Sequence, residues 1–321
     1  MTESAHLAAI IEKRESAANL MVVFADIVSY SRRRTVNQKA VIDVFTKILT
    51  DALNAQAAKN VEYCQKNGLN FSTDIIKIPT GDGAALGFSF DGLHEIHLNF
   101  ALDLLERVHE HNVANPCEIY SAAGWCNCHA NFELRIGIST GKTVIFRDIN
   151  GNYNAAGNAM NLAARVMGQV DAGQIALSAE AYENLIDMAE DPQMAQKFVV
   201  FENIRIKHNL LLDIYQYVSP DSAFVNVNTP SRFAQWAAIQ ESGKLLTTLH
   251  PGFQLSNVTD MDPTKLPAMM KEFASAVEAI QAAEAQQNAT MSRIFGGLGA
   301  GGPAVVEGAI IDGEDHPDSG G

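Results

Sequence analysis

The chain has 321 residues and a formal net charge of −14, with 47% hydrophobic and 19% charged residues. This balance is typical of a globular protein that can bury a full core. A strongly negative surface repels nucleic acid and anionic membranes, so neither is expected as a partner. A polyanionic ligand would need a local concentration of metal ions, arginine and backbone N–H groups.

The N-terminal segment mixes acidic with basic residues and has no long apolar core, so no signal peptide is expected. The apolar runs elsewhere are too short or too interrupted to span a bilayer. The four cysteines, Cys64, Cys117, Cys126 and Cys128, do not make a disulfide framework, and a reduced cytoplasmic location is expected. Cys126, Cys128 and the adjacent His129 are typical zinc ligands. No second ligand pair stands at usable spacing, so no zinc is expected.

The first half of the chain shows clear periodicity. The continuous apolar run Asn19–Asp26 predicts a buried strand. Apolar residues at helical spacing from Val36 to about Gln65 predict one long amphipathic helix. The short runs 74–79 and 84–90, joined by a Gly-Asp-Gly turn, predict a β-hairpin. Residues 93–111 are again helical, and the histidines along them are expected at the surface or its boundary.

The second half continues with strands at 132–139, 143–146 and 174–177, helices at 158–170 and 179–188, and a closing hairpin at 198–206 and 210–218. Alternating strands and helices with hairpins among them predict an α/β sandwich, one sheet with helices packed on it. This domain is expected over residues 19–220, after an N-terminal segment 1–18. A helical extension is expected over 221–295 and a flexible Gly-rich tail over 296–321.

Two acidic residues stand where apolar strands stop or turn. Asp26 ends the first strand, and Asp82 lies in the hairpin turn between two glycines that leave space for a ligand. Paired carboxylates on adjacent strands suit Mg²⁺ or Mn²⁺ bound together with a triphosphate. Asp26 is followed by residues whose backbone N–H groups could cradle phosphates at a helix start, namely Ile27, Val28, Ser29, Tyr30 and Ser31.

A third element is the predicted helix that carries Asn161 and Arg165. The i, i+4 spacing places the amide and the guanidinium on one helix face. Taken alone, such a pair is more typical of a solvated helix face than of a site.

Together these motifs resemble the class III adenylate/guanylate cyclase family over roughly residues 19–218. The family's F-x-D-I-x-x-F/Y-S/T and G-D-G-x-x-x-x-F motifs are matched by Phe24–Ser31 and Gly81–Phe88. Its R-x-G-I-x-x-G motif is matched by Arg135–Gly141, and G-x-x-V/M-N-x-A-A-R followed by G-x-I-x-x-S by Gly157–Arg165 and Gly173–Ser178. Four motifs in the right order are a specific signal. The resemblance implies the class III cyclase fold, with a ferredoxin-like βαββαβ core.

The resemblance also implies roles for the matched residues. Asp26 and Asp82 would hold two divalent metal ions, Mn²⁺ or Mg²⁺, with the Ile27 carbonyl as a further ligand. Asn161 would orient the ribose, and Arg165 would stabilise charge on the α-phosphate during attack.

Two more positions match triphosphate contacts of the family: Arg135, and Lys207 in a looser register. In the family, one subunit supplies the metal half of each site and the other supplies the Asn/Arg half. This chain has both halves, which implies a symmetric homodimer with two shared active sites.

Base selection in the family depends on two positions that differ here. The position three residues before the Gly of G-D, usually Lys for adenine or Glu for guanine, is Ile78. The position seven residues before the helix Asn, usually Asp or Thr for adenine and Cys for guanine, is Asn154. An apolar side chain cannot hydrogen-bond a purine edge, and losing such a bond costs on the order of 1–3 kcal/mol. Neither purine pair is present.

Two explanations compete: a degenerate cyclase that reads the base poorly, and a pyrimidine cyclase. The intact metal and transition-state residues argue against degeneration. A short stand-alone chain with these substitutions resembles the pyrimidine cyclases of the Pycsar anti-phage systems, whose cyclic UMP or cyclic CMP acts on a separate effector protein. UTP is the expected substrate and CTP the next. Asn154 can donate to uracil O4 or accept from the cytosine N4 amine, so the amide alone does not choose.

Two alternatives stay open: an adenylate cyclase that makes cyclic AMP, and a non-catalytic pseudo-cyclase that only binds nucleotide. The presence of Asp26, Asp82, Asn161 and Arg165 favours catalysis over the second. A diguanylate cyclase is set aside because the hairpin lacks a G-G-D/E-E-F turn.

Overall fold

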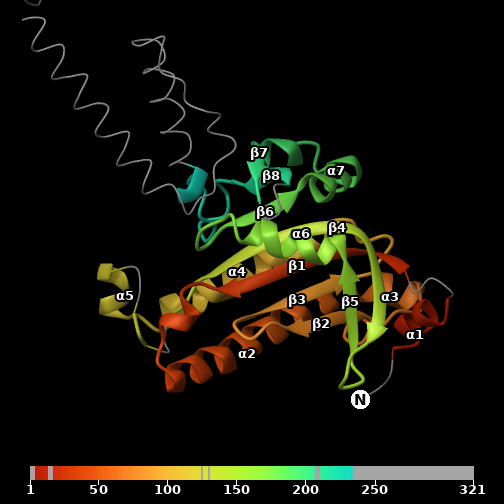
Figure 1. The fold of residues 1–321 in the computed structure, drawn as a ribbon, viewed down its shortest axis with the longest axis horizontal. Coiled ribbons are helices and arrows are strands. Elements are labelled where there is room, and N and C mark those ends of the chain that lie inside the picture. The colour runs from red at the N-terminus through yellow and green to blue at the C-terminus, as the bar shows by residue number, and fades with distance from the viewer. Residues whose placement is uncertain (1–3, 14–16, 124–125, 129–130, 207–209, 234–321) are drawn as a thin grey trace, which may run out of the picture. The chain divides into compact units, whose positions relative to one another are not determined.

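The computed structural model describes residues 4–13, 17–123, 126–128, 131–206 and 210–233. Its strands form one eight-stranded sheet in the order β2-β3-β1-β4-β6-β8-β7, with β5 paired to β4 (Figure 1). The strands are β1 Ala17–Ile27, β2 Ile75–Pro79, β3 Gly83–Phe88, β4 Leu134–Arg147, β5 Tyr153–Gly157, β6 Ile175–Ser178, β7 Phe198–Arg205 and β8 Leu211–Tyr217. Of the strand pairs described, only β4 with β6 is parallel.

The helices are α1 Ala5–Glu12, α2 Thr35–Lys59, α3 Val61–Lys66, α4 Ile96–Ala114, α5 Glu118–Ala123, α6 Asn158–Met167 and α7 Ala179–Met188. The succession β1-α2-β2-β3-α4-β4 is a βαββαβ unit, and its strands stand in the order β2-β3-β1-β4. This is the order of a ferredoxin-like sheet. The predicted α/β sandwich with a ferredoxin-like core is therefore confirmed.

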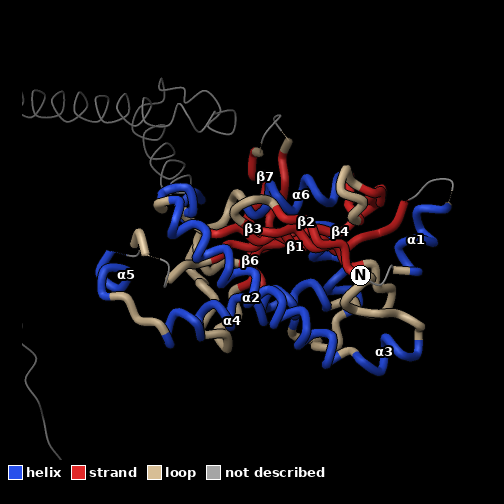
Figure 2. Tube along the Cα trace, turned by 90° about the horizontal axis from the view of Figure 1, so that it is seen from below, coloured by secondary structure: helices blue, strands red, loops and turns tan. Residues whose placement is uncertain are grey.

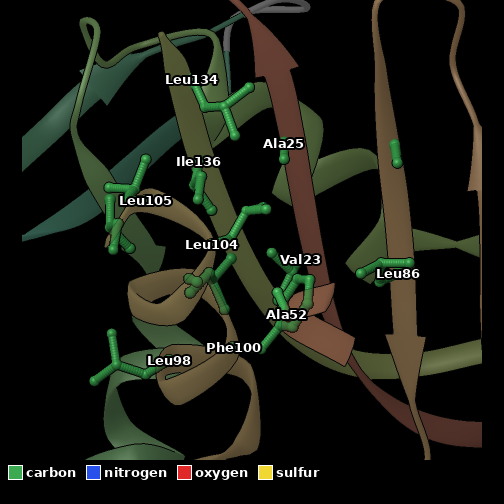
Figure 3. Packing of buried hydrophobic residues seen from close by; sticks show 14 of the residues in the cluster. Val23, Ala25, Ala52, Leu86, Leu98, Phe100, Leu104, Leu105, Leu134 and Ile136 are labelled. Atoms are coloured by element: carbon green, nitrogen blue, oxygen red, sulfur yellow. The ribbon is translucent and has the colours of Figure 1, made fainter. Parts of the chain in front are cut away.

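Alternate residues of β1 point to opposite faces of the sheet and enter two separate cores. Val23, Ala25 and Ile27 lie in the larger core, which the sheet forms with α2, α4 and α7. Figure 3 shows Val23 and Ala25 beside residues of α4 in this core. Leu20 and Val22 lie in a smaller core with α1, α6 and β5. Figure 2 shows α2 and α4 on one side of the sheet and α6 on the other. Asp26 follows Leu20 and Val22 in the same alternation, so it lies on the α6 face.

The close approach of α6 to the sheet depends on Gly137 in β4. A Cβ atom at this position would lie 2.3 Å from the carbonyl oxygen of Ala163 and 2.3 Å from the backbone nitrogen of Met167. Both atoms belong to the α6 backbone and cannot move without moving the helix. A glycine here thus fixes the distance between α6 and the strands beside it.

Several predicted elements need correction. The long helix over 36–65 is divided at Asn60 into α2 and α3, where the backbone leaves the helical region at φ −110° and ψ 20°. The strands predicted at 132–139 and 143–146 are one continuous strand, β4. Neither β5 nor α1 was predicted, and α1 buries Leu7 completely in the smaller core.

His97 was expected near the surface, and this prediction was wrong. Its side chain is 1% exposed, and neither ring nitrogen has a hydrogen-bond partner among the described residues. Burial, with a smaller contribution from His94, lowers the pKa of His97 to about 4. His97 therefore lies in the fold as a neutral imidazole. It lines a cavity of about 360 Å³ together with Met21 and Thr140.

Two of the cysteines are joined, although all four were expected as thiols. The structure pairs Cys126 with Cys128 in a disulfide, while Cys64 and Cys117 are free. Among the described helices, none is both long enough and apolar enough to cross a membrane. The predicted extension falls largely, and the predicted tail entirely, on residues 234–321, outside the described part, and both stay predictions.

Candidate active site

Asp26 and Asp82 lie side by side at one end of the interior strands β1 and β3. Asp26 lies near the end of β1, and Asp82 lies in the turn that joins β2 to β3. The backbone N–H of Ile27 donates to the carbonyl oxygen of Asp82 over 2.9 Å, which fixes the turn beside the end of β1. Asp26 is 8% exposed and Asp82 is half-buried. The two carboxyl groups are close enough for Asp82 to raise the pKa of Asp26.

Gly83 makes this arrangement sterically possible. It stands opposite Asp26 in the β1–β3 register. A Cβ atom on Gly83 would lie 2.0 Å from the carbonyl oxygen of Ala25, well inside any allowed contact. The glycine after the acid therefore allows the hairpin to close on β1, which explains why the turn reads Gly-Asp-Gly.

Arg135 completes the cluster from the neighbouring strand. It faces Asp26 in the β1–β4 register, and its guanidinium donates to one oxygen of Asp26 from Nε over 2.9 Å and from the terminal nitrogen over 2.8 Å. Burial raises the pKa of Asp26, Arg135 lowers it, and Asp82 raises it again, so the net pKa lies above the usual range. Two acids thus share a partly dehydrated site that favours added positive charge.

The residues after Asp26 form a tight turn with free donors. Ser29 has a left-handed backbone with φ 57°, and the 3-10 helix Tyr30–Arg32 follows it. A left-handed residue next to right-handed ones points successive N–H groups into one concavity, which is typical of anion sites. Within the described residues, the N–H groups of Ser29, Tyr30 and Ser31 have no protein acceptor.

Two N–H groups of this predicted cradle are already engaged. Ile27 donates to Asp82, and Val28 donates to the carbonyl oxygen of Glu133 over 2.9 Å. With respect to the part of the chain that the structure describes, only the last three positions of the predicted phosphate-binding run offer unpaired N–H donors. The expected role of the Ile27 carbonyl as a metal ligand stays a prediction.

The residues present fit a divalent cation. Asp26 and Asp82 are hard oxygen ligands of the kind that Mg²⁺ and Mn²⁺ prefer, and their mutual repulsion is relieved by positive charge. Arg135 supplies such a charge to Asp26 in this structure. The cluster can therefore bring cationic charge, protein or metal, against an incoming triphosphate.

Asn161 and Arg165 lie on α6, on the same face of the sheet as Asp26. Asn161 is exposed and Arg165 is half-buried. Among the described residues, neither side chain makes a hydrogen bond or an ion pair. The single chain thus does not join this pair to the carboxylates, and both groups remain available to a ligand or to another subunit.

The two predicted base-selecting residues lie on neighbouring strands. Ile78 on β2 and Asn154 on β5 are both half-buried, and β2 and β5 contact each other. The amide oxygen of Asn154 accepts the N–H of Ala155 over 2.7 Å. The amide NH₂ has no hydrogen-bond partner among the described residues, and the oxygen keeps a second lone pair.

Lys207 lies outside the described residues, so its predicted phosphate contact stays a prediction. The Arg135–Asp26 ion pair was not predicted, because nothing in the sequence gives the register between β1 and β4. Cys117 was also missed: its sulfur lies 3.9 Å from that of Cys128, although eight residues stand between it and the Cys-Asn-Cys triplet.

The family model of the adenylate and guanylate cyclase catalytic domain matches residues 12–209. A comparison with curated protein sequences found no match.

Three solved structures serve as examples of the structural likeness. The guanylate cyclase domain of RhGC from Catenaria anguillulae in complex with GTP is 19% identical at a TM-score of 0.43, covering 63% of this chain and 97% of that one. The adenylate/guanylate cyclase/hydrolase from Silicibacter pomeroyi is 18% identical at a TM-score of 0.43, covering 64% and 98%. The adenylyl cyclase CyaB from P. aeruginosa is 20% identical at a TM-score of 0.41, covering 63% and 95%.

Proposed function

The chain belongs to the adenylate and guanylate cyclase catalytic-domain family, and on this premise we propose that it cyclises a pyrimidine nucleoside triphosphate. The substrate is UTP first and CTP next, and the products are the 3′,5′-cyclic monophosphate and pyrophosphate. The observation that carries the proposal is the pair Asp26 and Asp82 at the sheet edge, with Arg135 and three free N–H groups beside it.

The residues at the sheet edge bind and orient the triphosphate. Asp26, Asp82 and the Ile27 carbonyl would hold two divalent ions, Mn²⁺ or Mg²⁺. Such ions, when bound, lower the pKa of the ribose 3′-hydroxyl and neutralise phosphate charge. The N–H groups of Ser29, Tyr30 and Ser31 have no acceptor among the described residues, and a left-handed residue at such a turn is typical of sites that bind phosphate oxygens. Arg135 can turn from Asp26 to the triphosphate without leaving the site.

The other half of the reaction needs a second copy of the chain. Among the described residues, the Asn161 and Arg165 side chains have no partner, so a symmetric homodimer can use them to orient the ribose and to stabilise charge on the α-phosphate. Apolar side chains of the β4–β5 hairpin support such an interface: Val144 is 46%, Phe146 39% and Ile149 99% exposed.

The base preference rests on Ile78 and Asn154. An apolar residue gives no hydrogen bond to a purine edge, and Ala155 uses one lone pair of the Asn154 oxygen. The amide NH₂ can donate to a keto oxygen such as O4 of uracil, and the second lone pair of the oxygen can accept from the N4 amine of cytosine. UTP stays the first candidate and CTP the next. A cyclic pyrimidine nucleotide acts as a signal, so the proposal includes a separate effector protein that binds it. It also includes a role in phage defence and a cytoplasmic location.

The test is to incubate the purified full chain with Mn²⁺ and each of ATP, GTP, CTP and UTP, and to identify products by mass. The Asp82→Ala variant, prepared in parallel, excludes a contaminating cyclase. Cyclic UMP in excess over cyclic CMP is expected. Cyclic AMP alone would show that the base assignment is wrong. If no nucleotide gave a product, a non-catalytic nucleotide-binding protein would replace the enzyme as the better proposal.

A further inference from the structure

Three cysteine side chains that the proposed reaction does not use converge beside the start of α2. We propose that Cys117, Cys126 and Cys128, which we call the cysteine cluster, bind one Zn²⁺ ion when all three are reduced. Their sulfur atoms lie within 4.8 Å of one another. Among the described residues, no other group of three Cys, His, Asp or Glu side chains comes together in this way.

The distances between the sulfurs suit a tetrahedral ion. With Zn–S bonds of about 2.3 Å, two thiolates at adjacent corners of a tetrahedron lie about 3.8 Å apart. The sulfurs of Cys117 and Cys128 are 3.9 Å apart. Cys117 precedes α5 and the other two follow it, so two separate segments of the chain supply the ligands. Three protein ligands leave the fourth position to water.

The disulfide and the metal site are alternative states of the same sulfurs. In the structure Cys126 and Cys128 are joined, which removes two of the three ligands. Two equivalents of a thiol reductant convert this disulfide into two cysteine thiols and one reductant disulfide. Binding of Zn²⁺ to the three thiols then releases three protons and forms a tris-thiolate with a net charge of −1. Reduction is therefore the condition for binding.

A buried arginine favours that negative charge. Arg33 is 4% exposed, and its guanidinium donates to the carbonyl oxygens of Cys128 and Asn131, the latter over 2.8 Å. The Nε atom of Arg33 is buried without a hydrogen-bond partner among the described residues. A nearby cation stabilises thiolates. A zinc tris-thiolate would in turn supply the negative charge that Arg33 lacks.

The cysteine cluster is also tied to the segment that follows the anion-binding turn. The backbone N–H of Arg34 donates to the side-chain oxygen of Asn127 over 2.8 Å, and the Asn37 amide donates to the Asn127 carbonyl. Asn127 stands between Cys126 and Cys128. Thiolates select zinc over the Mg²⁺ or Mn²⁺ of the proposed active site, so the two kinds of ion do not compete.

The experiment compares reduced and oxidised full-length protein. Each form is incubated with Zn²⁺ and desalted, and zinc is counted by atomic emission. One zinc per chain is expected in the reduced protein and none in the oxidised protein. X-ray absorption at the zinc edge should then show three sulfur ligands at about 2.3 Å. A reduced protein without zinc, or zinc surrounded only by nitrogen and oxygen, would overturn the proposal.

Single variants assign the ligands. Cys117→Ser, Cys126→Ser and Cys128→Ser should each lose the zinc, whereas Cys64→Ser should keep it, because Cys64 lies in α3 outside the cluster. Zinc retained in Cys117→Ser would contradict the site. If a variant fails to fold, the X-ray absorption spectrum of the reduced natural chain still shows whether three sulfur atoms bind the zinc. None of these measurements uses nucleotide turnover, so they are independent of the proposed cyclase activity.

Discussion

Arg135 on β4 faces Asp26 on β1, and this ion pair influences the pH at which Asp26 loses its proton. Burial and Asp82 raise the pKa of Asp26, and Arg135 is the group that lowers it. A carboxyl group must be ionised to hold a cation, so activity should fall as the pH drops through this raised pKa.

Arg135→Gln should therefore move the acid limb of the kcat/KM profile to higher pH. Removing the guanidinium removes the main contribution that keeps the Asp26 pKa down, while burial and Asp82 remain. The measurement is kcat/KM against pH for the natural chain and the variant. Arg107→Gln, on α4 and paired with Asp103, is the control. An unchanged acid limb would show that Asp26 does not control it.

Ile78 and Asn154 should determine which nucleotide base the protein selects. The double variant Ile78→Lys with Asn154→Asp supplies the pair that the family uses for adenine. It should raise kcat/KM for ATP relative to UTP by about tenfold or more, since each paired hydrogen bond contributes on the order of 1 kcal/mol. Rates with both nucleotides, measured separately, give this ratio. An unchanged ratio would place base recognition elsewhere.

His97 should make the fold sensitive to acid. Its pKa of about 4 lies below the ordinary 6.5, so the folded state favours the neutral ring. The stability that follows from this is fully present above about pH 6.5. It is lost by about 1.4 kcal/mol per pH unit as the pH falls towards 4.

Urea unfolding between pH 4 and 7 measures this loss. His97→Phe keeps a ring beside the cavity and removes the titrating group, so the pH slope should become shallower. His109→Gln, an exposed position on the same helix, should leave the slope unchanged. An equal slope in the natural chain and His97→Phe would contradict the assignment to His97.

At the scale of the elements, the position of α6 depends on its close contact with Gly137. Gly137→Ala would place a methyl group 2.3 Å from the α6 backbone, which must shift. Such overpacking costs about 1–3 kcal/mol, and displacement of Asn161 and Arg165 by 1 Å can reduce turnover about a hundredfold. Gly87→Ala is the control, because its new Cβ meets only side chains of Leu20 and Ile76, at 3.1 Å or more. Melting temperature and kcat are measured for both.

The elements that the sequence predicted well have strong periodicity or a motif. β1, the β2–β3 hairpin, α6, α7 and the closing hairpin lie close to their predicted positions. The break at Asn60 was missed because apolar spacing continues through it, and β4 was divided because Ser139–Lys142 is polar and glycine-containing. β5 is short, and only its pairing with β4 defines it. The site residues were found through motifs, whereas Arg135–Asp26 and Cys117–Cys128 depend on register and tertiary proximity.

At the scale of the whole molecule, a shared site predicts complementation. Asp82→Ala and Arg165→Ala should each be inactive as homodimers, since each lacks one half of both sites. In an equimolar mixture with free exchange, half of the dimers are mixed and each carries one intact site of two. About one quarter of the natural activity should return.

The measurement is cyclic nucleotide formation after subunit exchange, with exchange verified by a mass-tagged copy. Two copies of the same variant mixed together serve as the control. Full exchange without recovered activity would exclude the shared site and require Arg165 to act within its own chain.

The position of β1 has a consequence for synthesis of the chain. β1 lies between β3 and β4 in the sheet, yet it is made first, and β4 is complete only at Arg147. At about 5–20 residues per second, a ribosome needs on the order of ten seconds to reach that point. Until then one edge of an apolar strand has no neighbour. The rate of translation therefore limits how soon this sheet can form. Until β4 is made, β1, the strand that carries Asp26, stays unpaired along that edge.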